Sequence, residues 1–471
     1  MRKTKIICTI GPACENEETL SAMCDAGMNV ARLNFSHGTH AEHLEKIRLI
    51  RAVREKKNLP IAIMLDTKGP EYRIKTFREG KVFLKDGERF TLTTEEAEGD
   101  EHRVSVTYQG LTEELAPGDT VLINNGLVIL KVEDIHGKDV DCRVEAGGEL
   151  SNRKSMNFPG KVLRQDYLSE QDRSDILFGI EQDVDFIAAS FVSCREDVQA
   201  VRTLLDENGG KNIDIIAKIE NRKGVEHVEQ ICEVADGIMV ARGDLGVEIP
   251  FMEVPAVQKY LISRCRLLGK RVITATEMLE SMIHNPRPTR AEISDVANAV
   301  YDGSSAIMLS GETAAGKYPV QAVRTMAETA EYTESHIDYA EWFHTTKFQI
   351  HNNLDAISHA TCAMAVDVNA KAIVVNSISG RTARMVSRFR CPVHILGTTT
   401  EEKAWRKLNL SWAVTPVLNE AYSSMDVMFW QDLKYARELL HLQPGDNVVL
   451  TGGQINGAPG NTNTIKVECI R

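Results

Sequence analysis

The fold is decided by IDIIAKI at residues 213–219 and GIMVA at residues 237–241. Each run is short, almost wholly apolar and rich in β-branched residues, which is typical of a strand buried on both faces of a parallel sheet. Six more runs of this kind occur at residues 5–10, 29–34, 61–66, 184–191, 271–276 and 305–310. Amphipathic helical patterns separate most of them. Eight strands in β-then-α order predict an α/β fold, a closed (β/α)8 TIM barrel.

Two other segments of the chain do not follow this pattern of barrel strands and helices. Between residues 72 and 167 short alternating strands are separated by turn signals such as Asp86-Gly87 and Asn125-Gly126, which predict a small inserted all-β domain. Such a domain would lie over the rim of the barrel, where a lid is placed. From residue 346 to 471 helices and strands predict a C-terminal α/β open-sheet domain. The expected barrel domain is therefore residues 1–71 with 168–345.

Composition and charge exclude several classes of protein. The 471 residues carry a formal net charge of -12, whereas a nucleic-acid-binding protein needs a basic face. No two of the ten cysteines have C-x-x-C spacing, so neither a zinc site nor a redox dithiol is indicated. The first apolar run ends at Gly11-Pro12, too early for a signal peptide or a membrane span. We expect a cytoplasmic protein without nucleic-acid or membrane partners.

Polar side chains gather at the ends of the predicted strands, where a (β/α)8 barrel carries its catalytic groups. Arg32, Asn34 and Ser36 share one face of a strand, as do Lys218 and Glu220, because side chains alternate along a strand. Each residue alone would be interpreted as a solvated loop residue. Several charges directed to one rim would repel one another unless they bound something.

The residue types at this rim predict phosphoryl transfer. Glu220 and Asp244 are hard carboxylates that, with substrate oxygens and water, suit Mg²⁺. Lys218 and Arg32 would spread the charge of a phosphoryl group in transit. Residues 243–246 read GDLG and open a predicted short helix, whose free N–H groups would accept a substrate carboxylate. A small phosphorylated acid satisfies all three elements.

These residues lie in stretches that resemble the pyruvate kinase family along nearly the whole chain. The stretches are KTKIICTIGPA, GMNVARLNFSHG, LDTKGPE, AKIEN, MVARGDLG and ITATEMLESMIHNPRPTRAE. The resemblance implies transfer of the phosphoryl group of phosphoenolpyruvate to ADP, giving pyruvate and ATP in the last step of glycolysis. It also implies a bacterial type without the additional C-terminal domain, allosteric regulation and a homotetramer.

The resemblance further implies a role for each site residue. Lys218, Thr276 and Arg32 would be catalytic, and Glu220 and Asp244 would bind Mg²⁺ or Mn²⁺. The implied substrate contacts are Arg32, Lys218, Gly243, Asp244, Thr276 and Ser310; the nucleotide contacts are Asn34, His37 and Arg73; and the K⁺ ligands are Asn34, Ser36, Asp66 and Thr67. Glu71 occupies the position where K⁺-dependent members keep Glu, so we expect K⁺ to be required.

A hydroxyl-rich turn, NSISGRT at residues 376–382, joins a predicted strand to a predicted helix. A helix N-terminus flanked by hydroxyls is a phosphate cradle. The resemblance implies that Ser377, Ser379, Gly380, Arg381 and Thr382 bind a sugar-phosphate effector, with residues 456–464 closing over it. The alternative interpretation is an ordinary capped strand–helix turn.

Two alternative functions stay open at this point, and so does the effect of one difference from the family's sequence pattern. The first alternative is a Mg²⁺-dependent lyase or aldolase of the phosphoenolpyruvate/pyruvate barrel type, which also pairs Glu and Asp on a metal. The second is a catalytically silent sugar-phosphate sensor. Asn124-Asn125 replaces an Asp pair of the family, which leaves open the nucleotide and metal contacts of that pair.

Overall fold

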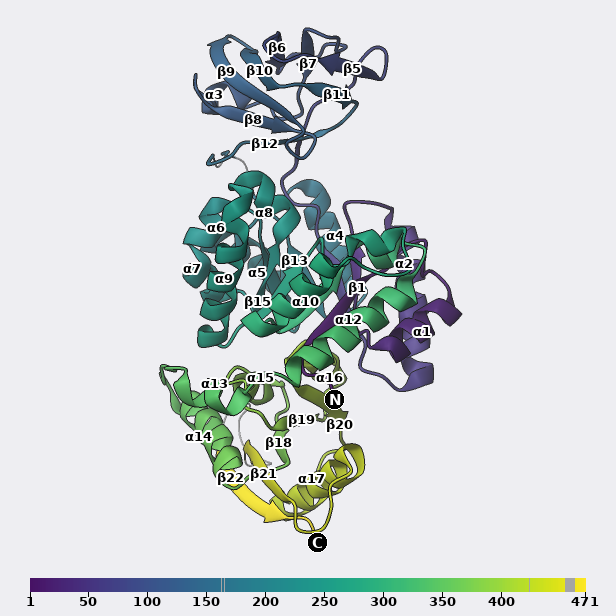
Figure 1. The fold of residues 1–471 in the computed structure, drawn as a ribbon, viewed down its shortest axis with the longest axis vertical. Helices are drawn as coiled ribbons and strands as arrows, with labels where there is room; N and C mark the ends of the chain where they lie inside the picture. Colours follow the sequence, from purple (N-terminus) through teal and green to yellow (C-terminus); the bar gives the residue numbers. More distant parts are fainter. Residues whose placement is uncertain (162, 165, 423, 454–461) are drawn as a thin grey trace.

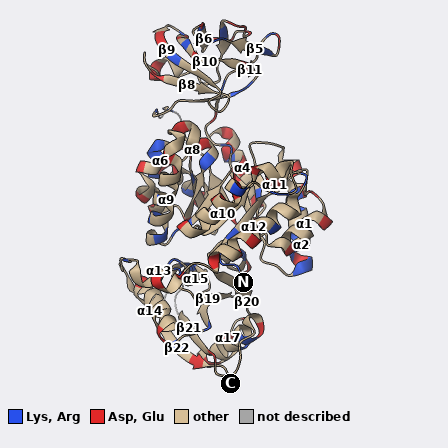
Figure 2. Cartoon of the chain, in the orientation of Figure 1, with Lys and Arg blue, Asp and Glu red and all other residues tan. Residues whose placement is uncertain are grey.

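Three parts are stacked along the long axis of the molecule (Figure 1). The computed structural model describes every residue except 162, 165, 423 and 454–461. An inserted β unit lies at one end, the barrel in the middle, and a C-terminal α/β unit at the other end. Acidic and basic residues are intermixed along the chain in all three parts (Figure 2). Among the described residues no helix has the length and apolar character needed to cross a membrane.

The central part is a closed parallel barrel with the strand order β1-β17-β16-β15-β14-β13-β3-β2. Its strands are β1 (Lys5–Thr9), β2 (Val30–Asn34), β3 (Ala62–Asp66), β13 (Phe186–Ala189), β14 (Asp214–Ile219), β15 (Gly237–Ala241), β16 (Arg271–Ala275) and β17 (Ala306–Leu309). Each lies within two residues of the run that predicts it, and the TIM barrel is confirmed.

Helices surround the barrel in the expected order. The longer ones are α1 (Glu17–Ala26), α2 (His40–Lys57), α4 (Glu170–Glu181), α5 (Arg195–Glu207), α9 (Val254–Leu268), α10 (Arg290–Asp302) and α12 (Pro319–Glu334). The shorter ones are α6 (Arg222–Glu226), α7 (Val228–Val234), α8 (Arg242–Glu248), α11 (Gly311–Ala314), and the 3-10 turns η1 (Phe251–Glu253) and η2 (Glu280–Ile283). Helix α13 (Tyr339–Thr345) instead packs on the C-terminal unit, whose apolar cluster includes Tyr339 and Phe343 (Figure 1). Capping boxes at Thr39 and Thr289 fix the starts of α2 and α10.

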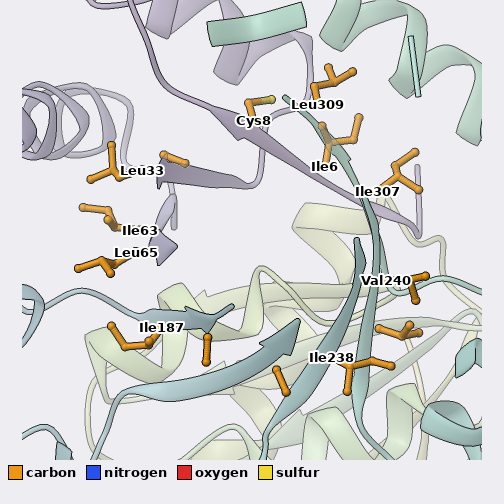
Figure 3. Close-up of a cluster of buried hydrophobic side chains, with 14 of the residues drawn as sticks. Ile6, Cys8, Leu33, Ile63, Leu65, Ile187, Ile238, Val240, Ile307 and Leu309 are labelled. Carbon is orange, nitrogen blue, oxygen red and sulfur yellow. The ribbon is translucent and has the colours of Figure 1, made fainter. Parts of the chain in front are cut away.

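Two apolar layers hold the barrel together because alternate residues of each strand face opposite sides. The outward residues, such as Ile6, Leu65 and Ile238, join the layer between strands and helices (Figure 3). The inward residues, such as Ile7 and Met239, fill the interior. This inner cluster also contains Leu410 of the C-terminal unit, which has no exposed surface. A residue from another part of the chain therefore completes the interior of the barrel.

The insertion after β3 forms a sheet in the order β4-β12-β8-β9-β10-β6-β7, with β11 and β5 paired separately. The strands are β4 (Tyr72–Arg73), β5 (Lys81–Leu84), β6 (Arg89–Thr93), β7 (Arg103–Ser105), β8 (Thr120–Ile123), β9 (Val128–His136), β10 (Asp139–Ala146), β11 (Gly148–Ser151) and β12 (Ser155–Asn157). One short helix, α3 (Leu111–Glu114), accompanies them. The unit has a hydrophobic core of its own, and the predicted inserted β fold is confirmed.

The C-terminal unit is an open sheet in the order β20-β19-β18-β21-β22, in which only β22 is antiparallel to its neighbour. Its elements are α14 (Asn353–Asp367), β18 (Ala372–Asn376), α15 (Arg381–Ser387), β19 (His394–Thr399), α16 (Glu402–Leu408), β20 (Val414–Leu418), α17 (Met425–Leu440), β21 (Asn447–Gly453) and β22 (Thr462–Cys469). Separate apolar clusters cover the two faces of the sheet. This is the predicted α/β open sheet.

Ion pairs join the C-terminal unit to the amino-terminal end of the barrel. Arg406 of α16 bonds the fully buried Asp185, immediately before β13, at 2.8 Å. Lys407 and Arg271 both pair with Asp214 at 2.7 Å. The opposite end of the barrel, which bears the carboxyl ends of the strands, is thus left for the inserted unit.

Candidate active site

A cluster of opposite charges is buried at the carboxyl ends of β2, β3 and β14. Asp66 has no exposed surface, and its Oδ2 accepts a hydrogen bond from Arg32 Nε at 2.6 Å. Its Oδ1 lies 3.0 Å from Lys218 Nζ. Because strand residues alternate in direction, Arg32, Asp66 and Lys218 all point into the barrel. The apolar layers that surround them hold these three groups in place.

The pairing within this cluster fixes its charge state. Burial alone would raise the pKa of Asp66, but the Arg32 and Lys218 cations outweigh it and leave that pKa below its usual range. Burial alone would lower the pKa of Lys218, but Asp66 and Glu220 raise it above its usual range. Lys218 is therefore a permanent ammonium at physiological pH.

Glu220 is a buried carboxylate with one unsatisfied oxygen. It is fully buried, and its Oε2 accepts the Phe191 backbone N–H at 2.5 Å. Its Oε1 lies 3.1 Å from Lys218 Nζ, yet it accepts no hydrogen bond of good geometry from the described residues. Burial, with Asp244 as a further cause, raises the pKa of Glu220 to about 8 despite the opposing Lys218. A bound cation would stabilise the ionised form of this carboxylate.

The donors present fit a hard divalent cation. Glu220 and Asp244 line the same cleft, and the unsatisfied oxygen of Glu220 offers a ligand. Among the described residues no group of three or more His, Cys, Asp or Glu side chains could hold a metal. Two carboxylates completed by substrate and water are the usual Mg²⁺ arrangement at phosphate sites.

Two residues after β13, which the sequence analysis missed, support this cluster. Ser190 Oγ accepts from Lys218 Nζ at 2.7 Å and donates to the Thr67 carbonyl at 2.7 Å. Phe191 has φ of 55°, a left-handed conformation uncommon for a bulky residue. That conformation directs its N–H at Glu220. A serine and a phenylalanine at a strand end carry no sequence signal for these contacts.

The turn after β16 is also left-handed. Thr276 and Glu277 have φ of 68° and 53°, and such conformations cost about 1–3 kcal/mol each for non-glycine residues. The Thr276 hydroxyl accepts from the Gly243 backbone N–H at 2.8 Å and donates to the Ala275 carbonyl at 2.6 Å. The turn therefore places a hydroxyl beside the first turn of α8, which carries Asp244. Arg242, which the sequence analysis did not single out, donates hydrogen bonds to the backbone carbonyls of this turn.

The charged cluster forms the floor of a cleft of about 390 Å³ between the barrel and the inserted unit. The predicted site residues that line it are Arg32, Asn34, Ser36, Arg73, Lys218, Glu220 and Asp244. The inserted unit contributes Asn125, Phe158 and Lys161. Asn125 belongs to a left-handed turn with Asn124 and also borders a neighbouring pocket that contains Gly243 and Asp244.

Glu71 also lines this cleft, whereas Thr67, His37 and Ser310 do not. Thr67 is buried and its hydroxyl donates to the Ala188 carbonyl at 3.3 Å. His37 is exposed, and its carbonyl lies 2.9 Å from His43 Nε2. Ser310 follows β17, and its buried hydroxyl has no hydrogen-bond partner among the described residues. Glu71 pairs with Arg73 and, at 3.3 Å, with Lys68.

The predicted effector turn lies at the carboxyl end of β18. Ser377 Oγ accepts the Thr382 N–H at 3.3 Å, and Thr382 Oγ1 lies 2.6 Å from Thr462 Oγ1. Ser379 and Arg381 are exposed, whereas Gly380 is buried with φ of 75°, and a Cβ there would lie 3.0 Å from Leu408. Of the late loop predicted at residues 456–464, residues 456–461 lie outside the described part.

Comparison with known families follows the same division of the chain. The family model described as "Pyruvate kinase, barrel domain" matches residues 1–323, and that described as "Pyruvate kinase, alpha/beta domain" matches residues 355–468. The chain belongs to the pyruvate kinase family. A pyruvate kinase of Clostridium acetobutylicum is 46% identical over 472 residues, covering 100% of both chains. The Bacillus licheniformis pyruvate kinase is 47% identical, covering 100% of this chain and 81% of that protein.

A solved structure supports the same membership. The pyruvate kinase of Cryptosporidium parvum superposes with a TM-score of 0.95 at 39% identity, covering 100% of this chain and 96% of that one. As a pyruvate kinase, the protein is a phosphotransferase that acts on phosphoenolpyruvate and ADP. Neither the lyase nor the silent-sensor alternative is favoured by these matches. The pyruvate kinase family generally uses Mg²⁺ and K⁺.

Proposed function

We propose that the charged cluster at the rim is the catalytic centre of this pyruvate kinase. The observation that carries the proposal is the buried Lys218 ammonium, held between Asp66 at 3.0 Å and Glu220 at 3.1 Å beneath the cleft. Such a fixed cation stabilises a phosphoryl group in transit because it needs no reorganisation during the reaction. Arg32, held by Asp66 and by Thr9 Oγ1 at 2.8 Å, supplies a second oriented charge.

Glu220 and Asp244 would hold Mg²⁺ or Mn²⁺, which neutralises phosphate charge when bound. The remaining substrate contacts would come from Gly243, Thr276 and Ser310. The Thr276 hydroxyl, already hydrogen-bonded on both sides, is the group we assign to the proton relay that converts enolpyruvate to pyruvate. Hydroxyl groups in such positions act by holding or passing a proton at one defined atom.

We assign a K⁺ site to Asn34, Ser36, Asp66 and Thr67. Asn34 and Asp66 are register partners on β2 and β3, so their side chains emerge side by side at the rim. The Asn34 Oδ1 atom accepts the Ser36 N–H at 3.1 Å, which closes a local turn after β2. Oxygen donors of this kind suit a hard monovalent cation. Nucleotide contacts would come from Asn34 and Arg73, which line the cleft, and from the exposed His37.

The three predicted domains would divide the work. Residues 1–71 with 168–345 carry the chemistry, residues 72–167 act as the lid, and residues 346–471 bind the effector. The exposed Ser379 and Arg381 support a phosphate-binding role for the 377–382 turn. We further propose that the enzyme works in the cytoplasm as a homotetramer, in the last step of glycolysis, and is regulated by a phosphorylated sugar.

A coupled assay tests these assignments. Pyruvate release is measured with phosphoenolpyruvate, ADP and Mg²⁺, with and without K⁺, and with fructose 1,6-bisphosphate or a sugar monophosphate. We expect release to require ADP and K⁺ and to respond to a sugar phosphate. Pyruvate release without ADP would support a lyase instead. Equal rates with and without K⁺ would remove the K⁺ site from the proposal.

A further inference from the structure

Arg242 makes an unusual set of contacts with the left-handed turn after β16. Its side chain is 10% exposed, and its guanidinium donates to the carbonyls of three successive residues. Nε bonds Ala275 O at 3.3 Å, and Nη2 bonds Thr276 O at 2.6 Å and Glu277 O at 3.2 Å. These are the carbonyls whose directions change as the chain enters and leaves the left-handed region.

The guanidinium is itself fixed from the opposite side. Nη1 lies 2.8 Å from Asp295 Oδ1 and 2.7 Å from Asp295 Oδ2 on α10, and it donates to Gln258 Oε1 at 3.4 Å. The planar fork of arginine suits this task, because its five N–H groups have fixed relative directions. A lysine in the same place would offer one nitrogen for all these carbonyls.

One contact bears directly on the Thr276 hydroxyl. That hydroxyl donates to Ala275 O at 2.6 Å, and Arg242 Nε donates to the same oxygen. If the hydroxyl turns toward a substrate, Ala275 O keeps a donor and is not left unpaired in a buried place. An unpaired buried carbonyl would oppose that rotation. Arg242 thus holds the turn and also lowers the cost of releasing the hydroxyl from it.

We propose that Arg242 is a positioning residue for the proton-transfer step, acting through the Thr276 hydroxyl. This rests on the catalytic role proposed above for Thr276. In that step one proton, supplied by solvent through the Thr276 hydroxyl, is added to the methylene carbon of the enolate of pyruvate and gives pyruvate. In the reverse direction one methyl proton passes through the same hydroxyl to solvent. Arg242 itself need not contact the reacting atoms.

The test is a double-mutant cycle of Thr276 and Arg242 in which the exchange of the pyruvate methyl protons with solvent is measured. Loss of the pyruvate methyl proton signal in D₂O, with Mg²⁺, K⁺ and ATP, reports proton transfer without relying on pyruvate release. We expect Thr276→Ala and Arg242→Met each to slow this exchange about 100-fold, the scale of a lost acid–base group. The double variant should be no more than about 3-fold slower than Thr276→Ala, because residues that act as a unit are not additive. KM for phosphoenolpyruvate should stay within about 3-fold of wild type.

The outcomes separate the two proposals. Losses that multiply in the double variant would mean that Arg242 acts independently of the hydroxyl and would overturn its positioning role alone. Wild-type exchange by Thr276→Ala would overturn the role of Thr276 and, with it, that of Arg242. Arg264→Met is the matched control, because Arg264 of α9 pairs only with Glu229 on α7 among the described residues, and it should exchange at the wild-type rate.

A milder variant keeps the test valid if Arg242→Met does not fold. Asp295→Asn preserves the shape of the anchor but removes its charge, so Arg242 stays in place with one support weakened. We expect about a tenfold loss of exchange in the wild-type background and none in the Thr276→Ala background. An equal loss in both backgrounds would overturn the positioning role.

Discussion

The raised pKa of Glu220 predicts that metal binding releases a proton. A metal ligand must be deprotonated, and burial, opposed by Lys218 and reinforced by Asp244, raises the pKa of this carboxyl from 4.5 to about 8. Between pH 6 and pH 8 the metal must therefore displace a proton from Glu220. The apparent affinity for Mn²⁺ should rise about tenfold per pH unit well below pH 8, and about 50-fold in all between pH 6 and pH 8, or about 2.3 kcal/mol. Above pH 8 the affinity should level off.

The same shift has a definite sign for stability. Below pH 4.5 both folded and unfolded chains carry the proton on Glu220, so its contribution is fully present. As pH rises to about 8 the unfolded chain ionises first. The stability of the metal-free protein therefore falls by up to about 1.4 kcal/mol per pH unit across this window. Bound metal should restore it, because the metal replaces the proton as the positive partner.

Calorimetric titration with Mn²⁺ in buffers of different ionisation enthalpy measures the proton release directly. Glu220→Gln should bind Mn²⁺ more weakly and release no proton. The matched variant Asp244→Asn should also bind Mn²⁺ more weakly but still release about one proton for each metal ion bound. A wild-type affinity independent of pH between 6 and 8 would falsify this reasoning. So would a Glu220→Gln protein that releases the same proton.

Three further predictions concern the reaction, the effector turn and the interior of the barrel. Lys218→Met should lower kcat by several orders of magnitude in the steady-state assay while Mn²⁺ binding largely persists, since the lost contact belongs to the transition state; wild-type-like turnover would refute its role. Ser379→Glu should abolish activation by a sugar phosphate without changing basal activity, because the new carboxylate repels phosphate; unchanged activation would exclude the turn as the effector site. Leu410→Ala should lower the free energy of unfolding in urea by about 2–5 kcal/mol, against a change within about 0.5 kcal/mol for the exposed control Leu439→Ala; equal losses would contradict the packing of Leu410.

The sequence predicts the barrel and its charged rim because both depend on local pattern. Strands buried on both faces must be apolar, so Lys218 and Asp66 stand out within their runs, and alternation directs them inward. The left-handed conformations of Phe191 and Thr276 were not predictable, since neither residue type favours them. The contacts of Arg242 with Thr276 and of Leu410 with the barrel interior join segments more than thirty residues apart. Only the closed fold brings these segments together.

Strand β13 links two distant places in the molecule. Its first neighbour, Asp185, is held by Arg406 of α16, and the residues that follow it, Ser190 and Phe191, hold Lys218 and Glu220. The four residues of β13 therefore separate the contact with the C-terminal unit from the proposed catalytic cluster. At about 3.3 Å per residue the strand is a stiff rod of about 13 Å. A change at the contact between Asp185 and Arg406 therefore has a short path along β13 to the proposed catalytic cluster.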